Sequence, residues 1–285
     1  MTVAVDIRVR SATLADQRQI ADLLYNGQLI HRHLDWRHPL DWLGSAPFLM
    51  LEREGKLAAA LACPPDPPGV AWVRLFVDSG RYSTEGNWQA LWDVACAELT
   101  RQKILVAAVI VLQRWFIDSL LATGFNTHQS IVMLERIDKL PLEMTATPGV
   151  LIREMTLADL PAVAEVDASA FDLIWRNSLP SVEQAHHQAL LATVAEADGQ
   201  VIGYQLSTRN PLGAHLARLA VRPAAQGRGL GRALVADLTH RATQLGISHI
   251  TVNTQSDNRT SLALYARNGF RETGERFPVY QRQIS

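Results

Sequence analysis

Cysteine is scarce in this chain of 285 residues, which contains only Cys63 and Cys96. Two cysteines cannot build a disulfide framework, and neither stands in a CxxC or Cys/His spacing that would bind a metal ion. The clustered histidines form no recognisable ligand pattern with a carboxylate or thiol, and these are His31, His33, His38, His186 and His187. We therefore expect no metal, and the low cysteine usage favours a reducing, cytoplasmic location.

Net charge and long hydrophobic runs are also nearly absent. The 27 lysines and arginines are matched by 28 acidic residues, so the chain lacks the basicity to hold a polyphosphate backbone and we expect no nucleic-acid partner. The longest aliphatic run, Ile104–Leu112, has nine residues, less than half of a membrane span. The opening MTVAVDIRVR lacks a basic segment followed by an apolar stretch, so no secretory signal and no membrane partner are expected.

The length and an internal repeat predict two domains. The chain is 48% apolar and 19% charged, which suits substantial cores, and a typical domain has roughly 100–200 residues. Four segments recur in the same order at offsets of 143 to 145 residues: 10–16 with 153–159, 54–57 with 198–201, 74–77 with 218–221, and 124–125 with 269–270. We expect domains over residues 1–140 and 150–285, joined near 138–149, where DKLPLEMTATPG lacks periodicity.

Hydrophobic periodicity predicts a mixed α/β sheet in each half. Thr156 and Asp159 resemble a capping box at a helix start, and Asp198-Gly199 suits a hairpin turn. In the second half we expect strands over 150–153, 190–197, 201–208, 216–221, 247–254 and 277–284, and helices over 157–170, 231–245 and 261–268. In the first half we expect strands over 47–53, 57–63, 70–77 and 104–112, and helices over 14–24, 88–102 and 114–122.

A glycine-rich stretch, QGRGLG at residues 226–231, connects the predicted strand 216–221 to the predicted helix 231–245. Glycines let the backbone approach a ligand closely, and the free N–H groups at a helix start attract anions. Arg228 and Arg232 add positive charge, so the stretch predicts a pyrophosphate seat. A dinucleotide-binding loop needs G-x-G-x-x-G and an acidic residue on the next strand, which are missing here. A plain glycine-rich turn is the simpler alternative.

Two segments of the second half together resemble the GNAT superfamily of N-acyltransferases. LAVRP at 219–223, followed by Gln226-x-x-Gly229-x-Gly231, is similar to its acyl-CoA motif, Q/R-x-x-G-x-G/A. Asn258-x-x-Ser261-x-x-Leu264-Tyr265-x-x-x-Gly269-Phe270 is similar to its second signature. The resemblance covers residues 150–285 directly and the first half through the repeat. It implies an α/β protein of two tandem GNAT folds, each with a mixed, splayed central sheet flanked by helices.

The resemblance also implies acetyl-CoA as a cosubstrate. The pantetheine arm would bond to the backbone of the strand at 219–221, and the loop would hold the pyrophosphate. Tyr265, whose phenol stays protonated at pH 7, would protonate the leaving thiolate, although it could be an ordinary packing residue. The residues implied to bind the cofactor are Leu219, Ala220, Val221, Gln226, Gly227, Arg228, Gly229, Leu230, Gly231, Arg232, Asn258 and Ser261.

The sequence leaves the general base open. His215, at the start of the splayed strand, has a pKa suited to taking the amine proton directly or through water, but it could equally be only solvated. Ribosomal-protein N-terminal acetyltransferases of this family carry a glutamate five residues before the cofactor asparagine. That position is Asn253 here, which cannot act as a base. This departure argues against a peptide N-terminus as the acceptor.

The first half resembles a copy that has lost the chemistry. At the repeat offsets, Gln226, Gly229, Gly231 and Tyr265 correspond to Tyr82, Glu85, Asn87 and Leu120. A glutamate repels a pyrophosphate, and side chains obstruct close backbone approach. We therefore expect the second half to be active and the first half to support it.

The sequence predicts an acetyltransferase that moves an acetyl group from acetyl-CoA to a primary amine of a small molecule or peptide. The mycothiol synthase family resembles this architecture, so a thiol-sugar amine is an alternative acceptor. Peptide N-terminal acetylation and a non-catalytic acyl-CoA-binding protein are further alternatives. A purely structural double domain would have no need for the loop at 226–231. The chain is expected to act as a monomer or a homodimer.

Overall fold

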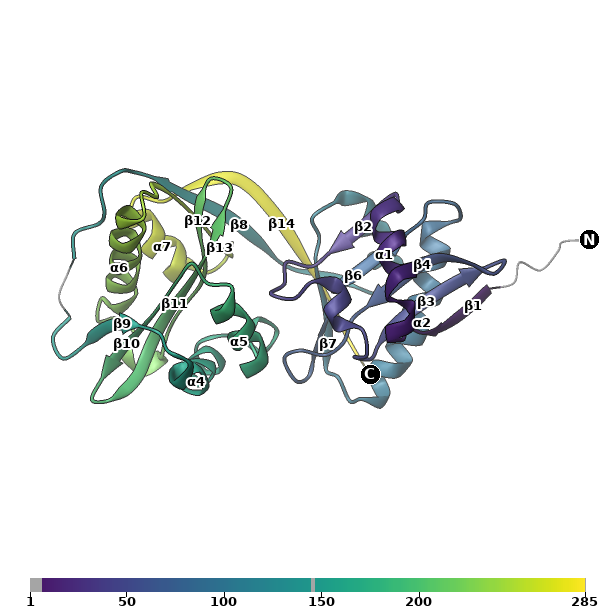
Figure 1. Ribbon diagram of the computed structural model, residues 1–285, viewed down its shortest axis with the longest axis horizontal. Helices are drawn as coiled ribbons and strands as arrows, with labels where there is room; N and C mark the ends of the chain where they lie inside the picture. The colour runs from purple at the N-terminus through teal and green to yellow at the C-terminus, as the bar shows by residue number, and fades with distance from the viewer. Residues whose placement is uncertain (1–6, 145–146, 285) are drawn as a thin grey trace, which may run out of the picture. The chain divides into compact units, whose positions relative to one another are not determined.

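The computed structural model describes residues 7–144 and 147–284. The chain divides into two compact units, Met1–His128 with Pro278–Ser285, and Gln129–Phe277. Strands and helices are mixed in both units (Figure 1), which confirms the predicted α/β class. Predicted segments that include residues 1–6, 145–146 or 285, among them the join at 138–149, lie partly outside the described residues.

The second unit is built on a mixed sheet. Its strands are β8 (Asn126–Ile137), β9 (Leu151–Glu154), β10 (Leu191–Ala197), β11 (Gln200–Asn210), β12 (Gly213–Val221), β13 (His249–Gln255) and β14 (Arg271–Gln283). They lie in the order β14-β8-β13-β12-β11-β10-β9, and β12 and β13 form a parallel pair between antiparallel neighbours.

Helices cover both faces of this sheet. They are α4 (Leu160–Ala170), α5 (Leu179–His187), α6 (Leu230–Gln244) and α7 (Arg259–Arg267). Figure 1 shows α6 and α7 on one side and α4 and α5 on the other. Alternation along the strands supplies apolar residues to the α6 side, where Leu216, Val252 and Leu134 pack against Val235 and Leu238.

The first unit repeats this plan with a broken sheet. Its strands are β1 (Ile7–Ser11), β2 (Leu29–Arg32), β3 (Phe48–Arg53), β4 (Lys56–Ala62), β5 (Val70–Trp72), β6 (Leu75–Asp78) and β7 (Val106–Ile110), and its helices are α1 (Gln17–Asn26), α2 (Thr84–Arg101) and α3 (Ile117–Ala122). Five of the strands have the order β1-β3-β4-β6-β2, while β5 pairs with β7.

Two long strands carry the chain from one unit to the other. β8 begins at Asn126 in the first unit, and residues 131–137 pair with β13 in the second. β14 begins at Arg271 in the second unit, and residues 279–283 pair with β7 in the first. Each unit therefore includes a strand segment from the other half of the sequence. The expected domains, 1–140 and 150–285, are the two copies of the sequence repeat. The compact units differ from them because residues 278–285 belong to the first unit and the chain from residue 129 onward belongs to the second.

Some predicted elements differ from the observed ones. The expected strand 70–77 is interrupted between β5 and β6, where the buried Arg74 turns its guanidinium to Asp35 at 2.9 Å. Strands β1, β2 and β8 and helix α5 were not expected. Pro180 lies in the first turn of α5, where its missing N–H needs no partner within the helix.

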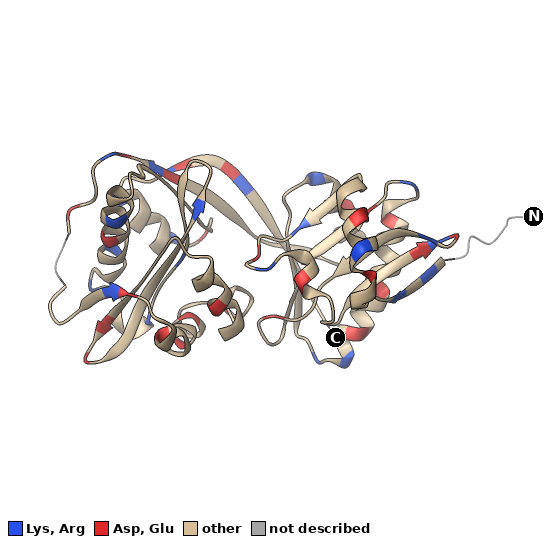
Figure 2. Ribbon diagram, in the orientation of Figure 1, with Lys and Arg blue, Asp and Glu red and all other residues tan. Residues whose placement is uncertain are grey.

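Charged side chains of both signs are interspersed along the ribbons of both units (Figure 2), in line with the formal net charge of −1. Within the described parts of the chain, no helix combines the length and the hydrophobicity needed to cross a membrane.

The repeat is visible as the same hydrogen-bonded device in both units. Arg10 binds both carboxylate oxygens of Asp16 at 2.8 and 2.9 Å, and Arg153 binds both oxygens of Asp159 at 2.8 Å. Each aspartate also accepts the backbone N–H of the threonine three residues before it, as the predicted capping box requires. Because these donors favour the ionised form, the pKa of each aspartate lies well below its usual value.

We expect Asp159→Asn to lower the free energy of unfolding by about 1–2 kcal/mol at pH 7, because one capping acceptor and the ion pair with the partly exposed Arg153 weaken. A carboxylate with a depressed pKa stabilises the fold above its unfolded pKa, about 3.9, and loses this contribution as the pH falls towards the folded value. The difference from the wild type, measured by denaturant unfolding, should therefore narrow below about pH 4. Asp16→Asn is the matched variant in the other unit, and a difference that is independent of pH would contradict the explanation.

Candidate active site

Strands β12 and β13 separate after three paired residues. Ala214, His215 and Leu216 lie opposite Ile250, Thr251 and Val252, and no pairing between the two strands continues beyond them in the described residues. β12 nevertheless runs on to Val221, still paired with β11 on its other side. The backbone of residues 219–221 therefore has one edge free to hydrogen-bond to a ligand.

A β-bulge lies at the same point of β12. Leu216 and Arg218 face neighbouring residues of β11, so Ala217 between them is unpaired. The extra residue reverses the alternation of side chains. Consequently Leu216 and Leu219 both pack on the α6 side, whereas His215 and Arg218 both lie on the α4 side.

The predicted glycine loop follows β12 and enters α6. Gly227 and Gly229 have φ of 76° and 80°, a left-handed conformation that disfavours a side chain, and an added Cβ would meet open space at both. Gly229 is the N-cap residue of α6, so no side chain caps this helix start. Its first N–H groups and the positive end of the helix dipole are therefore available to an anion.

The remaining residues of the loop have distinct structural tasks. Leu230 is buried and anchors the helix start, whereas Arg228 and Arg232 are exposed. Gly231 permits close packing of α6 on α7, because a Cβ there would lie 3.3 Å from Leu264. The Gln226 side chain donates to the carbonyl of Val221 at 3.0 Å, which ties the loop to the end of β12.

The second predicted signature forms α7. The Asn258 side chain caps this helix by accepting the N–H of Ser261 at 3.0 Å, so these two residues share one local contact. Tyr265 is buried beside Phe270, with ring centroids 5.5 Å apart. Burial raises the pKa of the Tyr265 phenol, which therefore stays protonated at neutral pH. Among the described residues, none hydrogen-bonds to this hydroxyl. Its oxygen is not among the fully buried side-chain atoms that lack a hydrogen-bond partner, so it is not completely enclosed by protein.

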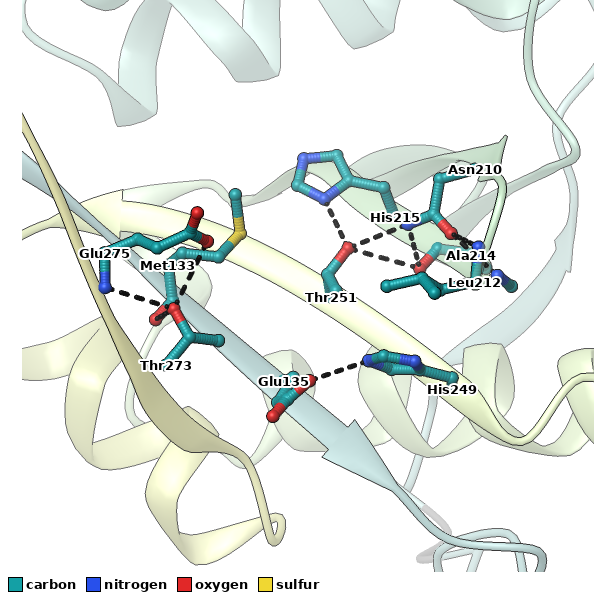
Figure 3. A network of polar contacts seen from close by, with 11 residues as sticks. Met133, Glu135, Asn210, Leu212, Ala214, His215, His249, Thr251, Thr273 and Glu275 are labelled. Carbon is teal, nitrogen blue, oxygen red and sulfur yellow. Dashed lines mark hydrogen bonds and ion pairs between the residues drawn. The ribbon is translucent and has the colours of Figure 1, made fainter. Parts of the chain in front are cut away.

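A polar network lies around His215 on the sheet (Figure 3). His215 Nδ1 is 2.9 Å from Thr251 Oγ1, and Thr251 lies opposite Glu135 of β8. Glu135 in turn contacts His249 Nε2 at 2.9 Å. Burial lowers the pKa of His215, which is therefore neutral at pH 7. Asn253 is on the same face of β13 as Thr251, one pleat further along.

A second network joins β12 to the segment after α4. Arg218 forms a bidentate ion pair with the fully buried Asp167, at 2.7 and 2.9 Å, and its guanidinium lies 3.6 Å from the centroid of Phe171. The hydroxyl of Tyr204 also donates to Asp167, and Arg218 donates to the carbonyl of Trp175. The segment 171–176 is thereby held against β12 next to the bulge.

Sequence reasoning missed both networks. Arg218 appeared only as part of the repeat, and its partner Asp167 lies in a different element with no spacing that links the two. Glu135 could not be placed because β8 was not expected. His249 and Thr251 lie within the predicted strand 247–254, and their alternation was a signal that they share a face.

The first unit has filled the corresponding positions. Its strand β6 carries β2 along one edge, with Ile30 opposite Val77 and His31 opposite Phe76, so that edge is not free. At the start of α2, the Ser83 hydroxyl accepts the N–H of Gly86 at 3.1 Å. Leu120, which corresponds to Tyr265, is buried in the core.

In the described residues, no group of three or more potential ligands could hold a metal ion.

Comparison with known proteins identifies the family. The pattern of the Acetyltransferase (GNAT) family matches residues 154–270. An N-alpha-acetyltransferase RimI from Mycobacterium tuberculosis is 34% identical over 146 residues, covering 48% of this chain and 89% of that protein. A mycothiol acetyltransferase from a Nocardioides strain is 30% identical over 174 residues, which cover 52% of this chain and only 59% of that relative. The chain belongs to the GNAT acetyltransferase family.

A solved structure shows the same fold along the whole chain. The tandem GNAT protein from the clavulanic acid biosynthesis pathway has a TM-score of 0.64 at 17% identity, covering 99% of both chains. This likeness confirms the predicted tandem GNAT fold and says nothing of the acceptor. The family transfers acetyl groups from acetyl-CoA to amines.

We expect Gly229→Glu to abolish acetyl-CoA binding while the fold persists, because the added carboxylate faces open space at the anion-attracting helix start. Gly229→Ala is the control: it carries the same left-handed strain, about 1–2 kcal/mol, without charge or bulk, and should retain most of the affinity. Calorimetric titration with acetyl-CoA measures both, and circular dichroism checks the fold. Normal affinity in folded Gly229→Glu would show that the loop does not bind the pyrophosphate.

Proposed function

We propose that the second unit transfers an acetyl group from acetyl-CoA to a primary amine. The observation that carries this proposal is that two features suited to the cofactor lie close together in the chain. The free backbone edge of β12 ends at Val221, and the uncapped start of α6 follows at Leu230. The first suits the amides of the pantetheine arm, and the second suits the diphosphate at its far end.

The cofactor contacts follow from these features. Leu219 and Val221 offer the backbone groups of the free edge to the pantetheine arm, whereas those of Ala220, between them, point to β11. The N–H groups of residues 227–232 hold the diphosphate, whereas that of Gln226 donates to the Pro223 carbonyl at 3.2 Å. Arg228 and Arg232 add charge-assisted bonds. The Asn258 side-chain oxygen accepts the Ser261 N–H, and its NH₂ group donates one hydrogen to Gln255 Oε1 at 3.3 Å. Asn258 therefore offers the second NH₂ hydrogen to the cofactor.

The chemistry needs one proton acceptor and one proton donor. The neutral amine attacks the thioester carbonyl, so that a C–N bond forms and the C–S bond breaks. His215 takes the proton from the amine nitrogen, and Tyr265 gives its phenolic proton to the departing sulfur. The lowered pKa of His215 and the raised pKa of Tyr265 put both groups in the required protonation states at neutral pH.

We propose a small-molecule amine as the acceptor. Asn253 stands where a glutamate would serve N-terminal acetylation, which disfavours a peptide N-terminus. The named relatives include a mycothiol acetyltransferase, so a thiol-sugar amine is the second candidate. Cys63 and Cys96 are free thiols, in keeping with a cytoplasmic location.

The direct test is release of CoA thiol from acetyl-CoA in the presence of amines of different classes: glucosamine, a diamine, an amino acid and a peptide with a free N-terminus. Turnover with a small amine supports the proposal. Tight acetyl-CoA binding without turnover on any amine would favour a non-catalytic acyl-CoA-binding protein.

We expect Tyr265→Phe to lower kcat by roughly 10- to 10³-fold, the scale of losing one general acid, with little change in acetyl-CoA affinity. The phenyl ring still packs against Phe270, so the fold should be unaffected. Steady-state kinetics and calorimetry separate the two effects. An unimpaired kcat would remove Tyr265 from the mechanism.

We expect one acetyl-CoA per chain, bound by the second unit. In the first unit, β2 covers the strand edge and Ser83 caps the helix start, so neither ligand contact remains. Calorimetric titration gives the stoichiometry, and Gly229→Glu should reduce it to zero. Two equivalent sites, or cofactor density against residues 75–87, would overturn the assignment of active and silent halves.

A further inference from the structure

We propose that Thr251, oriented by Asn210, holds His215 in the tautomer whose Nε2 is free to accept a proton. The inference rests on the proposed function, in which His215 is the general base. It assigns Thr251 and Asn210 as positioning residues, which need not touch the substrate.

The orientation of Asn210 is fixed by its own hairpin. Its Oδ1 accepts two backbone N–H groups, from Leu212 at 2.9 Å and Gly213 at 2.7 Å. An amide nitrogen could not accept these bonds, so Nδ2 must be the atom that faces Thr251 Oγ1 at 3.1 Å. Figure 3 shows the side chain in this arrangement. Asn210 therefore donates to the threonine hydroxyl.

Counting donors and acceptors at Thr251 then determines the proton on His215. The hydroxyl has one hydrogen and two lone pairs, and Asn210 occupies one lone pair. The Ala214 carbonyl has two lone pairs, one of which accepts the second N–H of Asn210 at 3.3 Å. If the hydroxyl donates to the other at 3.4 Å, the second lone pair of the hydroxyl accepts Nδ1–H of His215 at 2.9 Å. If it donates to Nδ1 instead, its bond to Ala214 is lost. The first arrangement makes three bonds and the second makes two, so Nδ1 carries the proton.

The free ring nitrogen is turned away from this network. In Figure 3 Nδ1 points to Thr251, and the other nitrogen of the ring points to the opposite side. His215 also lies directly before the point where β12 leaves β13, next to the free edge at 219–221. Nε2 is therefore unprotonated, and we expect its lone pair to face the position of the thioester.

The charged groups near this network have partners other than His215, and the Glu275 carboxylate of β14 accepts from Thr273 Oγ1 at 3.4 Å. Glu135 of β8 contacts His249 of β13, and Arg218 of β12 contacts Asp167 of α4. Burial is accordingly the cause of the lowered pKa of His215. Glu135 is the rival base, but it lies opposite Thr251 on β8 and is bound to His249, which lies two residues before Thr251 on the side away from the separating strands.

The proton balance is complete with these residues. As the C–N bond forms, the amine proton passes to Nε2 of His215, giving an imidazolium whose Nδ1–H remains on Thr251. As the C–S bond breaks, the Tyr265 proton passes to sulfur. Solvent then returns the proton from the imidazolium to the phenolate. In the opposite tautomer Nε2 would already carry hydrogen and could not accept the proton.

The primary test measures the tautomer and needs no substrate. In the full chain labelled with ¹⁵N-histidine, long-range ¹H–¹⁵N spectra should show His215 as the Nδ1–H form. Thr251→Val, which keeps the branched shape without the hydroxyl, should convert it to the Nε2–H form, and Thr251→Ser should restore the wild-type state. Thr208→Val is the matched control, because Thr208 lies opposite His215 on β11 but makes no hydrogen bond to it in the described residues.

The second measurement is kcat/KM against pH, with acetyl-CoA and the best amine of the panel. We expect Thr251→Val to lower kcat/KM roughly 10-fold or more at pH 7, and Thr251→Ser and Thr208→Val to have values of kcat/KM near that of the wild type. In Glu135→Gln, kcat/KM should still fall at acidic pH as in the wild type, which is the acidic limb of the profile. A wild-type Nε2–H tautomer would overturn the proposal, as would full activity in Thr251→Val or loss of the acidic limb in Glu135→Gln. If no amine reacts, the proposed function fails, while the spectra still decide the positioning.

Discussion

The separation of β12 from β13 after only three paired residues is the constraint on which the site depends. It leaves the backbone of Leu219–Val221 with a free edge and brings the end of β12 to the uncapped start of α6. The bulge at Ala217 shifts the alternation of side chains by one residue. Leu219 and Val221, which follow the bulge, therefore pack on the α6 side of the sheet and contribute to its core. The free strand edge and the unpaired Ala217 therefore both belong to one distortion of the sheet.

The two units share a fold but differ in whether the backbone groups of one strand edge and one helix start are hydrogen-bonded within the protein. Hydrogen-bonding groups on a strand edge or helix start can serve either the protein or a ligand. In the first unit β2 takes the strand edge and Ser83 takes the helix start, so both are satisfied internally. In the second unit the strand edge is open because β13 separates from β12, and Gly229 leaves the start of α6 without a capping side chain. Gly227 and Gly229 have the left-handed conformation that disfavours any other residue.

A buried ion pair links β12 to α4 on the side of the sheet where His215 lies. Asp167 has no exposure to solvent, so its negative charge is tolerable only because Arg218, Tyr204 and the N–H of Asn177 all donate to it. Arg218 is the one charged donor among these three, so its removal would leave the buried carboxylate uncompensated. The same face includes Glu135 on β8, a strand that comes from the first half of the sequence.

The sequence by itself determined the α/β class, the repeat, the glycine loop and the order of most strands and helices, because local periodicity, turn residues and capping patterns are written within short windows. The capping box of Thr156 and Asp159 and the turn at Asp198-Gly199, where φ is positive at both residues, form as expected. Only the tertiary structure decided that β2 covers the edge of β6, that β8 and β14 cross between units, and that Asn210, Thr251 and His215 meet. These pairings join residues far apart in sequence, and their hydrogen bonds depend on strand register, which a single strand cannot specify without its neighbour.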